Sequence, residues 1–129
     1  MDGHESFRAA VASMSEVTTE ALAACDCRPE GIGLFVYHQA NSLIIRAVGQ
    51  RLGLPAERVV DYVDRFANSS TATLPIALSV AQADGRLKRD DLVLVAAFGG
   101  GLTWGAAVAQ WSAAAPSPRV AQPSVTPTV

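Results

Sequence analysis

The sequence predicts an α/β domain in which helices lie in layers on a mainly parallel sheet, and the last strand is antiparallel. Amphipathic stretches alternate along the chain with short, nearly continuous apolar runs. That alternation is typical of parallel strands covered on both faces. Only Gly99, Gly100 and Gly101 separate the last two apolar runs. A connection this short requires the last two strands to be antiparallel.

Three amphipathic helices are expected, at residues 5–24, 42–52 and 71–83. In the first, apolar residues recur at three- and four-residue steps. The second is closed by Gly53, and a proline follows shortly after it. The third follows an Asn-Ser-Ser-Thr stretch at residues 68–71, whose side chains are suited to capping a helix N-terminus.

Four strands are expected, at residues 32–37, 58–63, 91–97 and 102–111. The first and third are nearly continuous apolar runs, which suits strands buried on both faces. The last alternates loosely between larger and smaller side chains. The predicted order is therefore helix, strand, helix, strand, helix, strand, strand.

Composition predicts one packed domain followed by a tail. Half of the residues are hydrophobic and 17% are charged, which is typical of globular rather than disordered chains. We expect the domain to span residues 1–111. Residues 112–129 are rich in proline, alanine and serine and are expected to form a flexible tail.

Several partners and sites are not expected. The net charge of −2, without runs of like charge, argues against nucleic acid or an anionic membrane as the primary partner. No apolar run reaches the roughly 18–20 residues that span a bilayer, and the N-terminus does not resemble a secretion signal. The expected location is the cytoplasm. Cys25 and Cys27, with only His4 and His38 as further soft ligands, make a poor metal site.

Special residues follow three of the predicted strands. His38 follows the first and Asn68 the second, while Phe98, Gly99 and Gly100 come after the third. The carboxyl ends of parallel strands are where ligands bind. An imidazole N–H and a carboxamide N–H can donate to one carbonyl oxygen, and consecutive glycines expose backbone N–H groups. The arrangement therefore indicates stabilisation of a developing oxyanion, such as an enolate.

Each of these residues also has a simpler interpretation. A histidine at a strand end is often only a hydrogen-bonded structural residue. Asn68 is suited to helix capping, and the glycines are suited to a tight hairpin. These alternatives stay open on the residues alone.

Four spaced motifs resemble one family. They are Met-Asp-Gly-His-Glu-Ser-Phe at 1–7, His-Gln-Ala-Asn at 38–41, Asn-Ser-Ser at 68–70 and Ala-Phe-Gly-Gly-Gly-Leu-Thr-Trp-Gly at 97–105. In this order they resemble the C-terminal half of β-ketoacyl-[acyl-carrier-protein] synthase III, a thiolase-like condensing enzyme. The resemblance covers residues 1–111 and implies a thiolase-like half-domain.

The resemblance also implies roles for particular residues. His38 and Asn68 would hold the thioester carbonyl of a malonyl group and stabilise its enolate after decarboxylation. Phe98 would shape the decarboxylation site, beside Gly99 in the active-site loop. The Gly100 N–H would form part of the oxyanion hole.

Substrates and partners follow from the same resemblance. Acyl-CoA and malonyl-acyl carrier protein would be substrates, and no cofactor or metal is implied. Gly3, Phe7 and Asn41 would lie along the channel for the pantetheine arm of CoA or of the carrier protein. The full enzyme would pair this half with an N-terminal thiolase-like half and would be a dimer.

The sequence departs from the family in three places. The nucleophilic Cys is absent, because Cys25 and Cys27 follow the first helix instead. Leu43 replaces a basic residue, and Ala67 replaces a glycine. We therefore expect the chain alone to be inactive and to need a Cys-bearing partner half. The alternatives are a non-condensing acyltransferase half, which the intact Asn68 disfavours, and a non-catalytic truncated remnant or interaction module, which Leu43 and the missing Cys favour.

Overall fold

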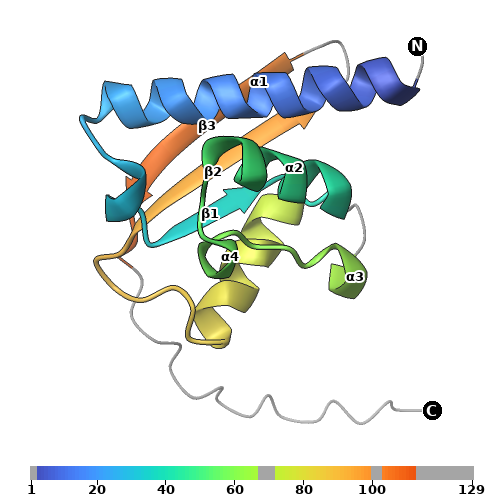
Figure 1. The fold of residues 1–129 in the computed structure, drawn as a ribbon. Coiled ribbons are helices and arrows are strands. Elements are labelled where there is room, and N and C mark those ends of the chain that lie inside the picture. Colours follow the sequence, from blue (N-terminus) through green and yellow to red (C-terminus); the bar gives the residue numbers. More distant parts are fainter. Residues whose placement is uncertain (1–2, 67–71, 100–102, 113–129) are drawn as a thin grey trace, which may run out of the picture.

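The computed structural model describes residues 3–66, 72–99 and 103–112. A long helix and a strand open the chain, three helices follow, and two adjacent strands end the described part (Figure 1). The helices are α1 Gly3–Ala24, α2 Ser42–Leu52, α3 Val63–Phe66 and α4 Thr73–Ala83, and the strands are β1 Leu34–Tyr37, β2 Leu92–Gly99 and β3 Thr103–Gln110. Short 3₁₀ turns lie at Pro29–Gly31 and Ala56–Arg58.

The described strands form one mixed sheet in the order β1-β2-β3. β1 is parallel to β2, with Leu34 opposite Val93, and β2 is antiparallel to β3, with Leu92 opposite Gln110. The predicted mixed α/β arrangement and the antiparallel last strand are therefore confirmed. β1 is buried along its whole length, as its continuous apolar run predicts.

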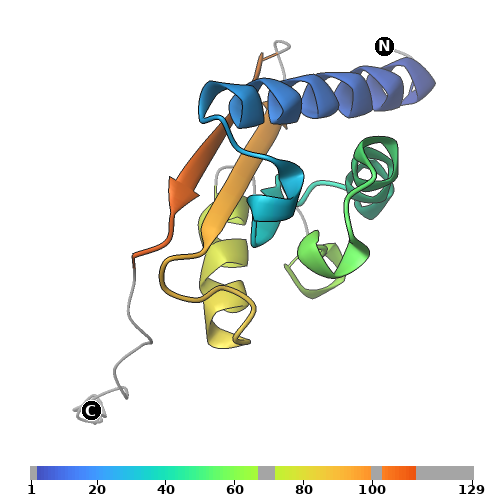
Figure 2. The same ribbon diagram turned by 60° about the vertical axis from the view of Figure 1, so that its left-hand side comes forward.

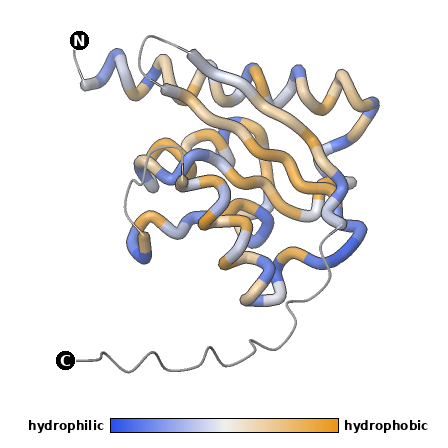
Figure 3. The backbone as a smooth tube through the Cα atoms, turned by 180° about the vertical axis from the view of Figure 1, so that it is seen from behind, coloured by the Kyte–Doolittle hydropathy of each residue, from blue (hydrophilic) through white to orange (hydrophobic). Residues whose placement is uncertain are grey.

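Two apolar cores lie on opposite faces of the sheet. The α1-side core joins α1 and α2 to one face of the strands, around residues such as Met14, Phe35 and Leu94. The α4-side core joins α4 to the other face, around residues such as Val36 and Ala77. Figure 2 shows α1 and α4 on different sides of the molecule, and Figure 3 shows that the central strands are its most continuously hydrophobic segments.

The predicted strand at residues 58–63 is wrong, since only a single parallel bridge forms there, between Phe35 and Val59. The Gln39 side chain takes the place of further ladder hydrogen bonds. Its amide nitrogen donates to the Val60 carbonyl at 3.3 Å, and its oxygen accepts from the Tyr62 N–H at 2.6 Å. The chain then turns into the short helix α3.

The start of the third long helix is described only in part. Within the described residues α4 begins at Thr73, and its N-cap residue, Ala72, makes no side-chain capping hydrogen bond. The predicted capping stretch, residues 68–71, lies outside the described residues, as does nearly all of the predicted tail. By contrast, α2 has both predicted ends, capped by Asn41 and Gly53.

Candidate active site

His38 is fixed to the sheet directly after β1. Its backbone N–H donates to the Ala96 carbonyl at 2.8 Å, so the β1–β2 ladder continues into the residue that carries the imidazole. The ring nitrogen Nδ1 lies 2.5 Å from the Thr73 hydroxyl oxygen, at the first turn of α4. Two elements that are far apart in sequence therefore hold the imidazole from its backbone and from its ring.

Burial favours the neutral form of the imidazole. The side chain is half-buried, and desolvation lowers the pKa of His38 below its ordinary value of 6.5. A neutral imidazole has one N–H donor and one acceptor nitrogen. Such a ring can donate a hydrogen bond to a carbonyl oxygen without first carrying a charge.

His38 lines an open cleft of about 400 Å³ at the carboxyl ends of the parallel strands. The opposite walls come from the β2–β3 hairpin, where the Phe98 and Trp104 rings stack with centroids 6.2 Å apart. Trp104 remains 42% exposed. The remaining lining residues are Ala97, Gly99, Thr103 and Gly105.

The cleft brings together three of the predicted site residues, His38, Phe98 and Gly99. Asn68 and Gly100 lie outside the described residues. The expected convergence of His38 with Asn68 therefore stays a prediction.

The three predicted channel residues are not among those that line this cleft. Gly3 is exposed at the start of α1, and Phe7 packs against the α1-side core. Asn41 has a local structural role, because its side-chain oxygen caps α2 by accepting from the Leu43 N–H at 2.8 Å.

Two cleft-side residues were not assigned a role from the sequence. Trp104 lies opposite Phe98 in the β2–β3 register. The predicted hairpin implies this pairing once the residues of its turn are known. Thr73 contacts His38 across 35 residues of sequence, and no local pattern indicates such a contact.

Comparison with known proteins places this geometry in a family. Residues 22–111 match the model of the 3-oxoacyl-[acyl-carrier-protein] synthase III C-terminal domain. The chain belongs to this family. The β-ketoacyl-[acyl-carrier-protein] synthase III of Acidiphilium cryptum (strain JF-5) is 53% identical over 84% of this chain, but only 34% of that relative is covered. The chain thus spans about a third of the length of the curated relatives it matches.

Solved structures agree with this assignment. The synthase III of Thermus thermophilus superposes with a TM-score of 0.83 at 51% identity, covering 87% of this chain and 35% of that one. A priming β-ketosynthase from the R1128 polyketide pathway superposes with a TM-score of 0.83 at 31% identity, over 90% of this chain and 35% of that one. The predicted thiolase-like half-domain of a synthase III is therefore confirmed.

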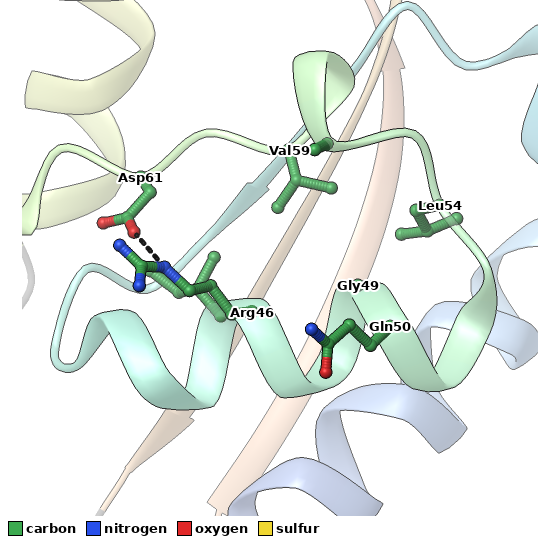
Figure 4. Close-up of a pocket in the computed structure, with 8 residues that line it drawn as sticks. Arg46, Gly49, Gln50, Leu54, Val59 and Asp61 are labelled. Carbon is green, nitrogen blue, oxygen red and sulfur yellow. Dashed lines mark ion pairs between the residues drawn. The ribbon is translucent and has the colours of Figure 1, made fainter.

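The position of the basic residue expected in the synthase III family is apolar and open to solvent. Leu43 is 63% exposed on the first turn of α2. Arg46, one turn further along, pairs with Asp61 at 3.5 Å on the wall of a separate pocket of about 330 Å³ (Figure 4). Asp61 also accepts from the Ser42 hydroxyl at 2.8 Å. Arg46 is thus engaged within its own domain, whereas Arg51 is exposed near the end of α2.

Neither cysteine lies in the cleft. Both are free thiols beyond the carboxyl end of α1. From the sequence we expect Cys25 to pack and Cys27 to be a loop thiol, but Cys25 is exposed and Cys27 packs against the α1-side core. A hydrogen bond with Cys25 and desolvation raise the pKa of the Cys27 thiol above its ordinary value. A raised pKa lowers the thiolate fraction and makes Cys27 a poor nucleophile.

The described part of the chain has neither a membrane-spanning helix nor a metal-binding cluster. None of its helices is both long and apolar enough to cross a membrane. Within the same residues, no group of three or more His, Cys, Asp or Glu side chains is placed to hold a metal ion.

Proposed function

We propose that this chain is the C-terminal catalytic half of a decarboxylating Claisen-condensing acyltransferase. The enzyme joins an acyl group to malonyl-acyl carrier protein in fatty-acid or polyketide synthesis. The observation that carries the proposal is the neutral His38 in a cleft shared with Phe98 and Gly99. Membership of the synthase III family supplies the reaction class.

In the proposed reaction His38 and Asn68 donate to the thioester carbonyl oxygen of the malonyl group. The bond to the malonyl carboxylate breaks, carbon dioxide leaves, and the electron pair enters the enolate. The enolate carbon attacks the acyl group on a cysteine thioester, and the thiolate leaves. Two donors aimed at the enolate oxygen lower the barrier, since one such donor is typically worth about 2.7–4 kcal/mol. Phe98 shapes the malonyl site, and the Gly100 N–H serves the second oxyanion.

The nucleophilic cysteine comes from a partner half. Two features of this chain support a protein partner on its α4 side. α4 contains no charged residue, and several of its apolar side chains, including Leu74 and Leu78, are only partly buried. A helix that is apolar on most of its surface is usually covered. Ala107 and Ala109 add exposed apolar surface on β3.

Acyl-CoA and malonyl-acyl carrier protein are the proposed substrates, and no cofactor takes part. Gly3, Phe7 and Asn41 are proposed to border the pantetheine channel once the partner half is in place. The assembled enzyme is proposed to be a dimer.

Reconstitution tests this proposal. The chain is purified and mixed with the Cys-bearing half of the Acidiphilium cryptum synthase III, and malonyl decarboxylation and condensation are followed. Activity should require both halves. Efficient condensation by the chain alone would contradict the need for a partner.

Variants separate the catalytic function from its alternatives. His38→Ala and Asn68→Ala should each reduce condensation by the pair by roughly 100-fold or more. Gln50→Ala, at an exposed position on α2, is the matched control. Full activity of both site variants would instead favour a non-catalytic interaction module, in agreement with the exposed Leu43.

A further inference from the structure

The Thr73 hydroxyl is buried against the ring of His38. Thr73 is only 3% exposed and is the first residue of α4. Among the described residues, its hydroxyl has a single hydrogen-bond partner, the Nδ1 atom of His38. A buried hydroxyl that cannot donate its proton carries a desolvation cost that no hydrogen bond offsets.

This pairing decides which ring nitrogen carries the proton. A hydroxyl has one proton to donate, and within the described part of the chain His38 Nδ1 is its acceptor. Nδ1 can accept only when it is unprotonated. In a neutral ring the proton must then be on Nε2.

We propose that Thr73 is a positioning residue that holds His38 as its Nε2–H tautomer, so that the imidazole presents a donor to the oxyanion of a bound ligand. This role rests on the proposed condensing function for its consequence in catalysis, but the tautomer itself exists without substrate. Desolvation of His38, which lowers its pKa, keeps the ring in the neutral form that the pairing needs.

The helix start gives Thr73 the rigidity that such a role requires. The β-branched side chain of threonine is restricted in its χ1 rotation, and Thr73 is buried in the first turn of α4. Groups that orient a ring through its second nitrogen typically change activity by 10- to 100-fold when removed, as seen for the outer partners of metal-bound histidines. The wrong tautomer should reduce activity more than a loss of packing would, because Nε2 of His38 would then have no proton to donate.

The tautomer is measured by ¹⁵N-detected NMR on the full chain without substrate. The chain has only two histidines, and a His4→Gln variant assigns the His38 signals. We expect the wild type to show a protonated Nε2 and an unprotonated Nδ1 that accepts a hydrogen bond. Thr73→Ser, which keeps the hydroxyl, should give the same pattern.

Thr73→Val keeps the shape of the side chain and removes the hydroxyl. It should shift the Nδ1 resonance and produce a mixture of tautomers, while backbone amide spectra report whether the fold is kept. A wild type with the proton on Nδ1 would overturn the proposal even if Thr73→Val did not fold. A folded Thr73→Val variant with an unchanged His38 pattern would overturn it as well.

The catalytic consequence is read separately in the reconstituted pair. Thr73→Val should lower kcat by roughly 10- to 100-fold with a smaller change in KM, and Thr73→Ser should restore most of it. If the pair shows no condensation with wild-type chain, the proposed function fails. The tautomer measurement does not depend on condensation and would still test the positioning role of Thr73.

Discussion

One side chain, that of Gln39, holds the segment between α2 and α3 where a strand was expected. The fully buried Gln39 donates to the Tyr37 and Val60 carbonyls and accepts from the Tyr62 N–H. A side-chain amide has the same donor and acceptor groups as a peptide bond. Gln39 therefore replaces backbone pairing at the edge of β1, directly beside His38.

Gln39→Leu should lower the free energy of unfolding by about 2–4 kcal/mol. The substitution keeps most of the volume but leaves buried backbone groups of Val60 and Tyr62 without partners, and each such group costs roughly 1–3 kcal/mol. Urea unfolding followed by circular dichroism measures the change. The control Gln50→Leu changes an exposed residue of α2 and should stay within about 0.5 kcal/mol of the wild type. Equal effects of the two substitutions would contradict this role of Gln39.

Stability should depend on pH through His38. Its pKa is lowered in the folded state, so between the folded and unfolded pKa values the unfolded chain binds more protons. The free energy of unfolding should therefore fall as the pH drops through about 6.5, the ordinary histidine value. Denaturant unfolding at a series of pH values tests this. His38→Gln should reduce the slope, and an unchanged slope would show that other groups cause it.

At the scale of elements, α2 is the helix whose start and end are clearest. Asn41 caps its start, and Gly53 ends it with a left-handed backbone, at φ 66° and ψ 30°. Both signals are local, but only Gly53 was recognised from the sequence, because Asn41 was assigned to the pantetheine channel and not to a cap. The strand prediction at residues 58–63 failed because a strand forms only when its backbone pairs with a neighbouring strand. Here the Gln39 side chain binds the Val60 carbonyl and the Tyr62 N–H, which such pairing would otherwise use.

Gly53→Ala should destabilise the chain by roughly 1–2 kcal/mol, which is the cost of a Cβ in the left-handed region. No atom lies within 4 Å of the added Cβ, so the loss is conformational and involves no clash. Gly31 also has open space around it but no positive φ, so Gly31→Ala is the matched control. Thermal and urea unfolding of both variants give the comparison. A similar loss in both would contradict the backbone explanation.

Much of the candidate site could be predicted from the sequence, but the contacts that hold its residues in place could not. His38, Phe98 and Gly99 follow strands that were recognised by their apolar runs, and the parallel register then brings them to one edge. The contact of His38 with Thr73 depends on how α4 packs on the sheet. Packing of this kind leaves no local pattern in the sequence, so the partner of the ring appears only in the structure.

For the whole molecule, the notable surface is the uncharged one where the sheet ends. β3 contains no charged residue, and in the described part of the chain no strand pairs with its outer edge. Natural edge strands commonly carry lysine, proline or a bulge that discourages pairing with other chains. The uncharged surface of α4 lies on the opposite face of the sheet from α1.

The isolated chain should therefore self-associate, and Ala107→Lys should increase its monomer fraction. Ala107 is exposed on β3, between two residues that face the α1-side core, so a lysine there would extend from the open face of the strand. Sedimentation velocity over a range of concentrations measures the effect. Ala24→Lys places the same charge at the exposed end of α1 and should leave association unchanged. A wild-type chain that stays monomeric throughout would contradict the prediction.

Both groups that hold His38 belong to this chain, namely the Ala96 carbonyl and the Thr73 hydroxyl. The imidazole therefore needs no contact with the partner half to reach its working orientation. If the proposed pairing is correct, we expect this half to be exchangeable and to combine with Cys-bearing halves from different synthases. Acyl selectivity in these hybrids would then follow the cysteine donor, while enolate chemistry would be inherited from this chain.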